Sequence, residues 1–196
     1  MEEKKLLITG FEPFGGESVN PSWEAVKALP EMIGGWRLIR LCLPVEYGRA
    51  ARLTEEAAVQ CGAGAVLCVG QAGGREAVTP ELVAVNLREA SLPDNAGFWP
   101  QAEPVDPQGP AAYFSTLPVW EMTRAIREAG IPARLSLSAG SFVCNDLLYS
   151  LLQRLPAVPC AFIHVPYLTG QSKPEAPAMT AEQLVTALTA AIGAIG

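Results

Sequence analysis

Short apolar runs alternate with helical stretches along this chain, and this alternation restricts the fold more than any other feature. Apolar runs that end near a glycine or proline are the expected strands: residues 6–9, 37–43, 65–69 and 160–164. Helices are expected between and after them: 21–29, 46–60, 119–129, 143–155 and from 181 onward. Strands that alternate with helices favour a mostly parallel sheet covered on both faces. The predicted fold is a three-layer α/β/α arrangement around an open, twisted sheet.

Four further segments are less regular. Residues 78–87 have extended character, with apolar side chains at a period of two, and a short strand is expected at 133–137. Residues 88–118, which hold many prolines, and 168–179 are expected to be loops. No repeat or boundary divides the chain, so a single domain is expected over residues 1–196.

Two helix starts carry clear signals. Asn20 precedes Pro21, which matches an N-cap followed by proline in the first turn, and Thr180 is a suitable cap for the last helix. Both positions predict where the chain enters a helix.

Composition excludes several classes of protein. Hydrophobic residues make up 49% and charged residues 17%, which argues against disorder. The net charge is -6 without a cluster of Lys and Arg, so a nucleic-acid partner is not expected. No apolar run approaches the roughly 20 residues of a membrane-spanning helix, and the start at residues 1–5 lacks the features of a secretory signal. A cytoplasmic location and no membrane partner are therefore expected.

The cysteines predict free thiols. Cys42, Cys61, Cys68, Cys144 and Cys160 are odd in number and contain no CxxC pair. Because the chain has 1 histidine, a zinc site is also hard to build, and no metal is expected.

The carboxyl ends of parallel strands are where ligands bind in open α/β sheets. Unusual segments that follow predicted strands are expected to meet at this edge: residues 10–16, 70–75, 138–145 and 164–166. The site of the protein is therefore predicted there.

Cys144 is the most informative residue of these segments. It lies at the start of a predicted helix, after a loop of small residues, whereas the other cysteines lie within strands or helices, where small buried hydrophobes are usual. The helix dipole and free N–H groups there are expected to lower the pKa of the thiol and to form an oxyanion hole. Position alone leaves both a nucleophile and a structural thiol open.

His164 is the only imidazole available as a base. It ends the strand that follows the Cys144 helix, and a right-handed β-α-β crossover would bring the two side chains together at one edge. The alternative is a core histidine with satisfied hydrogen bonds. A third group that orients the imidazole is usual. Glu81 is one candidate, although it could be a solvent-facing edge residue, and Asp94 and Asp146 compete with it.

The loop at residues 10–16 suggests phosphate binding, but it lacks the Lys-Ser/Thr of a P-loop and the spacing of a dinucleotide fingerprint. Phe11 and Phe14 are better interpreted as the apolar walls of a small pocket, with core packing as the alternative.

Five motifs together resemble the pyroglutamyl peptidase I (pyrrolidone-carboxylate peptidase) family of cysteine peptidases over nearly the whole chain. In family order they are TGFEPFGG at 9–16 with NPS at 20–22, GQAGGR at 70–75 with TPELVAVN at 79–86, PDN at 93–95, SAGSFVCN at 138–145 and FIHVPY at 162–167. The resemblance implies removal of an N-terminal L-pyroglutamyl residue from peptides. Cys144 would attack the carbonyl to form a thioester, His164 would transfer the proton, and Glu81 would stabilise the imidazolium.

The resemblance also implies a substrate pocket. Phe11 and Phe14 would flank the lactam ring, the backbone near Gln71 would bond the lactam, Asn20 would support the first loop, and Val143 would lie beside the nucleophile. Members of the family are commonly tetramers that need no cofactor or metal, so a homotetramer without a cofactor is expected.

Two positions depart from the family. Leu82 and Ser91 stand where basic residues are usual, and Arg88 could substitute for the arginine missing at position 91. These departures leave open a catalytically weakened protein that binds pyroglutamyl peptides. Because such α/β folds host many chemistries, a phosphorylase-like enzyme that acts on small molecules also stays open.

Overall fold

The computed structural model describes residues 4–171 and 175–196. The first residues of the chain, and residues 172–174 of the predicted loop at 168–179, lie outside this described part. The elements, in chain order, are β1 (Lys4–Phe11), α1 (Pro21–Ala28), β2 (Met32–Ile33), β3 (Trp36–Leu43), α2 (Arg49–Cys61), β4 (Ala65–Gln71), β5 (Thr79–Glu81), β6 (Val83–Val85), β7 (Ala112–Phe114), α3 (Val119–Glu128), α4 (Val143–Arg154), β8 (Cys160–Val165), β9 (Tyr167–Leu168), β10 (Ala178–Met179) and α5 (Ala181–Gly193).

The central sheet has the strand order β2-β3-β1-β4-β8-β5 within the described residues. Its middle strands β3, β1, β4 and β8 are parallel, and the short edge strands β2 and β5 are antiparallel to their neighbours. The prediction of a mostly parallel sheet is therefore confirmed.

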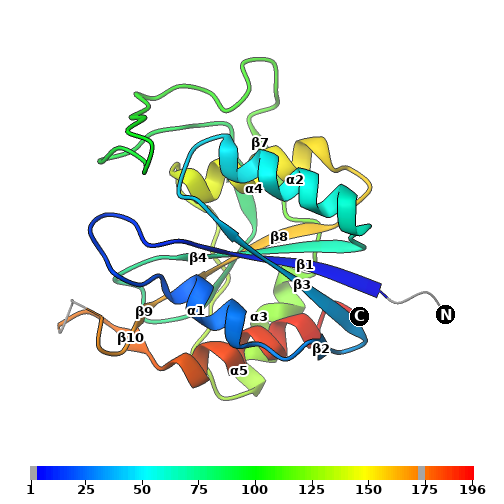
Figure 1. Ribbon diagram of the computed structural model, residues 1–196. Coiled ribbons are helices and arrows are strands. Elements are labelled where there is room, and N and C mark those ends of the chain that lie inside the picture. The colour runs from blue at the N-terminus through cyan, green and yellow to red at the C-terminus, as the bar shows by residue number, and fades with distance from the viewer. Residues whose placement is uncertain (1–3, 172–174) are drawn as a thin grey trace.

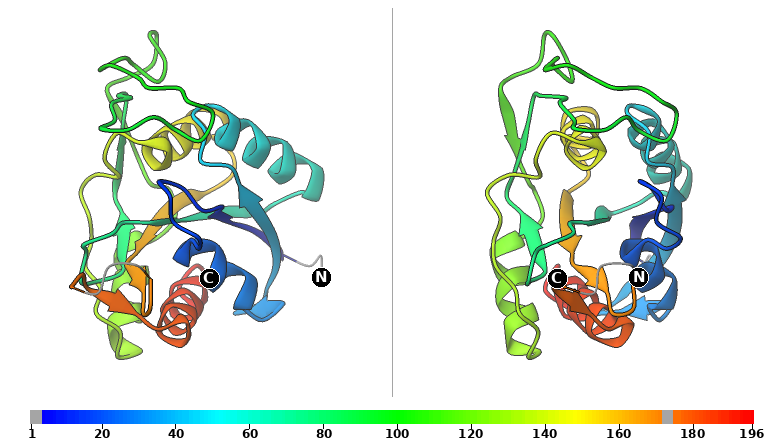
Figure 2. Two further views of the ribbon diagram at one scale, coloured as in Figure 1. Left: turned by 60° about the vertical axis from the view of Figure 1, so that its left-hand side comes forward. Right: turned by 90° about the vertical axis from the view of Figure 1, so that its left-hand side faces the viewer.

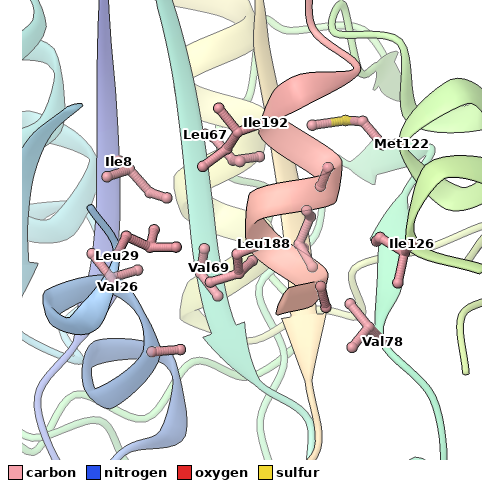
Figure 3. Close-up of a cluster of buried hydrophobic side chains, with 14 of the residues drawn as sticks. Ile8, Val26, Leu29, Leu67, Val69, Val78, Met122, Ile126, Leu188 and Ile192 are labelled. Carbon is pink, nitrogen blue, oxygen red and sulfur yellow. The ribbon is translucent and has the colours of Figure 1, made fainter. Parts of the chain in front are cut away.

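Helices cover both faces of this sheet (Figure 1). α2 and α4 lie on one face, and α1, α3 and α5 lie on the other. Figure 3 shows the second of these layers, where Leu188 and Ile192 of α5 pack against Leu67 and Val69 of β4, all of them fully buried. The three predicted layers are thus present, each helix burying one apolar face against the strands.

The predicted helix caps are present. The Asn20 side chain accepts the Ser22 N–H at 3.1 Å, and Thr180 forms a capping box with Gln183. The second helix, predicted from residue 46, begins at Arg49 instead. Gly48 has a φ of 66°, which cannot continue a right-handed helix, so the chain turns there first.

Residues 78–87 are extended, as expected, but they form two separate strands. β5 pairs with β8 in the central sheet, whereas β6 pairs with β7 in a separate ladder. The chain changes partners at Leu82, whose N–H donates to the Ser136 carbonyl at 2.8 Å. The composition changes at the same place, from Thr-Pro-Glu in β5 to Val-Ala-Val in β6, but the tertiary arrangement decides which strand each segment pairs with.

Other predictions between residues 88 and 137 were wrong in part. The region expected as loop contains β7, and the expected strand at 133–137 makes only isolated bridges, Val78 to Ala133 and Glu81 to Ser136. The long excursion between β6 and β7 extends beyond α2 and α4 in Figure 1. Within the described residues, no helix is long and apolar enough to cross a membrane.

Candidate active site

The loops that follow β1, β4 and β8 meet at the carboxyl edge of the sheet, as predicted (Figure 2, right). The segment 138–145 reaches this edge by a different route. Residues 133 and 136 bridge in parallel to the β5 segment, which is antiparallel to β8, so they run against the parallel strands. The expected β-α-β unit is therefore wrong in its first strand, although its helix and second strand are present.

Cys144 is the second residue of α4. The preceding N-cap position is Phe142, which has no side-chain oxygen, and no side chain caps this helix. Within the described part of the chain, the Val143 and Cys144 N–H groups donate to no protein acceptor other than the sulfur of Cys144 itself. Two free donors and the positive end of the helix dipole thus lie beside the thiol, which is the arrangement of an anion site.

Gly70 is adjacent to both Cys144 and His164. In the parallel ladder of β4 and β8, Gly70 is paired with His164. A Cβ placed on Gly70 would lie 2.9 Å from Cys144 Sγ and 2.6 Å from the Phe162 ring. Because only a glycine leaves this space, the thiol packs directly onto the strand position beside His164.

His164 is oriented by Glu81. The distance between His164 Nδ1 and Glu81 Oε1 is 2.7 Å, and the Glu81 side chain is fully buried. Arg75 Nη1 donates to the same carboxylate oxygen at 2.6 Å and also to the Thr79 hydroxyl. Glu81 is thus no solvent-facing edge residue. With the carboxylate ionised, Nδ1 carries the proton and Nε2 is left as the basic nitrogen.

The environment lowers the pKa of both members of this pair. Burial raises the pKa of Glu81, but the hydrogen bond and charge of His164, together with the hydrogen bond from Arg75, outweigh it and lower the pKa below its usual value. Burial lowers the pKa of His164, although the hydrogen bond and charge of Glu81 oppose this shift, and Arg75 adds to it. At neutral pH the pair is therefore a carboxylate and a neutral imidazole.

The pKa of Cys144 moves opposite to the expectation. Burial, followed by the charges of Glu81 and Cys68, raises the pKa of the thiol to about 12, and Arg75 only partly opposes this. The helix start was expected to lower it, and that prediction was wrong because desolvation of the thiolate exceeds the stabilisation by the N–H groups. A proton must therefore leave the thiol as it attacks, and a neutral imidazole is the group that can accept it.

A small, mostly apolar pocket opens beside the thiol. Its volume is about 30 Å³, and its lining consists of Phe11, Phe14, Asn20, Val45, Gln71, Phe142, Val143 and Cys144. The structure thus brings together the residues predicted from the sequence to bind substrate. The lining contains no lysine or arginine among the described residues, which gives a phosphate group no charged partner.

Hydrogen bonds hold the polar members of this lining. Asn20 Nδ2 donates to the Glu12 carbonyl at 3.0 Å, while Asn20 Oδ1 accepts the Ser22 hydroxyl at 2.8 Å. Asn20 therefore supports the loop after β1, as predicted. Gln171 Nε2 donates to Gln71 Oε1 at 3.0 Å, which ties the end of β4 to the loop after β9.

The site also contains three residues that were not predicted from the sequence to have a role: Arg75, Phe142 and Val45. Arg75 is the second partner of Glu81, and its only signal was its place in the segment after β4. Phe142 packs against Phe14, with ring centroids 6.0 Å apart, and lies within the quoted SAGSFVCN motif. Val45 follows β3, so the carboxyl-edge argument would have found it if applied to that strand.

The two competing acids serve other partners. Asp94 accepts the N–H groups of Tyr47 and Phe98 and so organises its own loop. Asp146 is buried and accepts the Gly48 N–H at 2.7 Å and Arg88 Nε at 2.6 Å. Neither carboxylate contacts His164, and Arg88 is engaged with Asp146.

The two departing positions lie in different surroundings. Leu82 packs against the core on the α5 side of the sheet, where an apolar side chain is favourable. Ser91 is exposed and lines a second groove next to the pocket.

All five cysteines are free, as predicted, but they differ in burial. Cys68 and Cys160 are buried, whereas Cys42 is exposed, and for Cys42 the expectation of a small buried hydrophobe was wrong. Its end of β3 extends past the short β2, which pairs only with Trp36 and Arg37. No group of His, Cys, Asp and Glu in the described part of the chain could hold a metal ion.

Comparison with known proteins gives a consistent result. The family model described as pyroglutamyl peptidase matches residues 4–196. Pyrrolidone-carboxylate peptidase of Levilactobacillus brevis is 46% identical, over 97% of this chain and 97% of its own length, and that of Escherichia fergusonii is 50% identical, over 96% and 91%. The crystal structure of pyroglutamyl peptidase I from Bacillus amyloliquefaciens has a TM-score of 0.94 at 41% identity and covers 98% of this chain and 97% of that chain. Pyrrolidone carboxyl peptidase from Thermococcus litoralis has a TM-score of 0.92 at 35% identity, with coverage of 98% and 93%.

Proposed function

Because the chain belongs to the pyroglutamyl peptidase family, we propose that Cys144, His164 and Glu81 remove the N-terminal pyroglutamyl residue from peptides. The protein is an enzyme that hydrolyses peptide bonds. The observation that carries the residue assignment is the buried His164–Glu81 pair, 2.7 Å apart, with the Cys144 thiol packed on the neighbouring strand. The phosphorylase-like alternative is not favoured by these relatives.

Attack by the thiol is the first step. Cys144 Sγ bonds to the carbonyl carbon between pyroglutamate and the next residue, and His164 Nε2 accepts the thiol proton. The carbonyl oxygen becomes an oxyanion, which the N–H groups of Val143 and Cys144 are positioned to bind. Charge thus develops where the free helix donors lie.

Release of the amine and of pyroglutamate follows. The imidazolium of His164 gives its proton to the leaving amine as the carbon–nitrogen bond breaks, which leaves a thioester on Cys144. His164 then takes a proton from water, whose oxygen attacks the thioester and frees pyroglutamate and the thiol. In both steps Glu81 stabilises the imidazolium and keeps the ring in one orientation.

The pocket suits the substrate ring. Pyroglutamate is a small neutral lactam, so recognition needs apolar walls and a few hydrogen bonds. Phe11, Phe14 and Val143 supply the walls, and the backbone near Gln71 supplies bonding groups for the lactam. Asn20 holds the loop that carries the two phenylalanines.

Hydrolysis of an L-pyroglutamyl anilide tests this proposal. Cys144→Ala is expected to reduce kcat/KM by about 10⁴-fold or more, since the nucleophile is lost. Cys42→Ala, which removes an exposed thiol, is the matched control and should keep the parent rate. Activity that persists in Cys144→Ala would exclude the nucleophile assignment. A folded parent protein without turnover, but with a Tm raised by a pyroglutamyl peptide, would identify a catalytically weakened binding protein.

We also propose that residues 1–196 act as one catalytic domain in the cytoplasm, without cofactor or metal, as a homo-oligomer that the family resemblance predicts to be a tetramer. Phe114, Trp120 and Leu137 are 66%, 62% and 71% exposed, and large apolar side chains on a surface favour subunit contacts. Sedimentation equilibrium checks the assembly, and a monomer at all concentrations would contradict it.

A further inference from the structure

A second groove lies beside the apolar pocket, and Phe142 lines both. Its volume is about 520 Å³, and its lining consists of Gly73, Glu89, Ala90, Ser91, Leu92, Ala139, Gly140, Ser141 and Phe142. The proposed function assigns it no role.

The two cavities are bordered by the same parts of the chain. Gln71, at the end of β4, lines the pocket, and Gly73, two residues later, lines the groove. On the other side, Phe142 lines both cavities, and Cys144 follows two residues later. A peptide bond held at Cys144 with its pyroglutamyl ring in the pocket therefore has the groove as the open space for the residues that follow.

We propose that this groove binds the leaving part of the peptide and that Glu89 makes it select a cationic residue directly after pyroglutamate. The inference rests on the proposed function, since the groove matters only if Cys144 cleaves such peptides. A lysine or arginine side chain at that position is the chemistry that a carboxylate attracts.

Glu89 is the only ionisable residue that lines the groove among the described residues. Two hydrogen bonds to Ser141 hold its backbone: the Glu89 N–H donates to the Ser141 carbonyl at 3.1 Å, and the Ser141 hydroxyl donates to the Glu89 carbonyl at 2.9 Å. The segment that carries the carboxylate is thus fixed next to the start of α4.

The Glu89 carboxylate has no protein partner in the described part of the chain. The cation next to it in sequence, Arg88, is bound to Asp146 at 2.6 Å and also lies 3.7 Å from Glu103. The negative charge of Glu89 is therefore available to a ligand. Ser91, in the same lining, is small and neutral, so it leaves both room and charge unopposed.

Two matched substrates separate the effect of a positive charge after pyroglutamate from the effect of the size of the side chain. Pyroglutamyl-lysine amide and pyroglutamyl-norleucine amide have the same unbranched side chain, with and without the ammonium group. The readout is the ratio of kcat/KM for these two amides, measured from released pyroglutamate at low ionic strength. Glu89→Gln is the test variant, and Glu121→Gln, which removes an exposed carboxylate on α3, is the control.

The lysine-to-norleucine ratio is expected to fall about three-fold in Glu89→Gln, the size of an exposed ion pair, and to stay at the parent value in Glu121→Gln. Salt at 0.5 M should reduce the parent ratio toward that of Glu89→Gln, because exposed charges are screened. Ser91→Arg adds a cation to the same lining and should lower the ratio further.

The outcomes separate the two proposals. A ratio that is equal in the parent and in Glu89→Gln, while both amides are cleaved, overturns the selection by Glu89 and leaves the proposed function intact. If the folded parent cleaves neither amide nor the anilide, the proposed function itself fails. A ratio that changes equally in Glu121→Gln would assign the effect to net charge and would also overturn the proposal.

Discussion

The N-termini of α4 and α5 are built in opposite ways. At α5, the Thr180 hydroxyl accepts the Gln183 N–H and the Gln183 side chain accepts the Thr180 N–H, so two helix donors are satisfied by the chain itself. At α4, Phe142 occupies the cap position and its side chain accepts nothing. The N-terminus of α5 is thus capped by side chains, whereas the N-terminus of α4 is uncapped.

The difference shows what each helix start does. A missing cap costs about 1 kcal/mol of stability, so an uncapped helix start needs a reason. At α4, the open donors lie beside Cys144, where an oxyanion would form in the proposed reaction, and the Phe142 ring forms part of the pocket. At α5, no such site is present among the described residues, and the cap serves stability.

Among the changes that test this comparison of helix starts, the largest effect is expected from filling the space next to the Cys144 thiol. Gly70→Ala places a Cβ 2.9 Å from Cys144 Sγ and 2.6 Å from the Phe162 ring, so the thiol must move. Displacement by about 1 Å is expected to lower kcat/KM about 100-fold or more. Gly193→Ala near the end of α5, where a Cβ meets nothing within 4 Å, is the control. Parent activity in Gly70→Ala would show that the thiol position is not critical.

Adding a side-chain cap to the N-terminus of α4 is expected to have the next largest effect on activity. Phe142→Ser and Phe142→Ala both remove the ring, but only serine can accept the Cys144 or Asn145 N–H as a cap. We expect the serine variant to be about ten-fold slower in kcat than the alanine variant and to have the higher Tm, since a cap competes with the oxyanion for donors. Equal kcat values for the two variants would argue against a role for these donors.

Removing the side-chain cap of α5 should lower stability without changing activity. Thr180→Ala removes the α5 cap and is expected to lower the free energy of unfolding by about 1 kcal/mol, measured by urea denaturation. Its kcat/KM should equal that of the parent. A loss of activity at a temperature where the variant is still folded would mean that the α5 cap also affects the site at the N-terminus of α4.

The smallest expected effect is a shift in the pH dependence of activity, caused by a change in the pKa of His164. Burial lowers the pKa of His164, Glu81 opposes the shift, and Arg75 adds to it. Since the imidazole must be neutral to accept the thiol proton, the acid limb of kcat/KM against pH reports this pKa in the free enzyme. Arg75→Met removes a positive charge, which should raise the pKa of His164 and move the limb to higher pH. Arg124→Met on α3 is the control; a limb that moves to lower pH in Arg75→Met would contradict this electrostatic account.

Much of the site could be predicted from the sequence because its parts are local. Asn20 and Thr180 cap helices through residues two or three positions away, and Cys144 lies at a helix start that its own neighbours define. From the sequence, the loops after β1, β4 and β8 were also predicted to lie at one edge of the sheet, because ligands bind at the carboxyl ends of parallel strands. What these residues share is that short-range patterns determine their positions.

The remaining features depend on contacts between distant segments. Glu81 contacts His164 because β5 pairs with β8 in antiparallel orientation, and Arg75 then contacts the Glu81 carboxylate. The extended character of residues 78–87 does not predict which strands its two halves pair with.

The chain order of motifs, the alternation of strands and helices and the free cysteines were determined by the sequence itself. The raised pKa of Cys144, the burial of Glu81 and the groove beside Glu89 were decided only by the tertiary structure. The physical reason is that desolvation and charge depend on every group that surrounds a side chain, and most of those groups are far away along the chain.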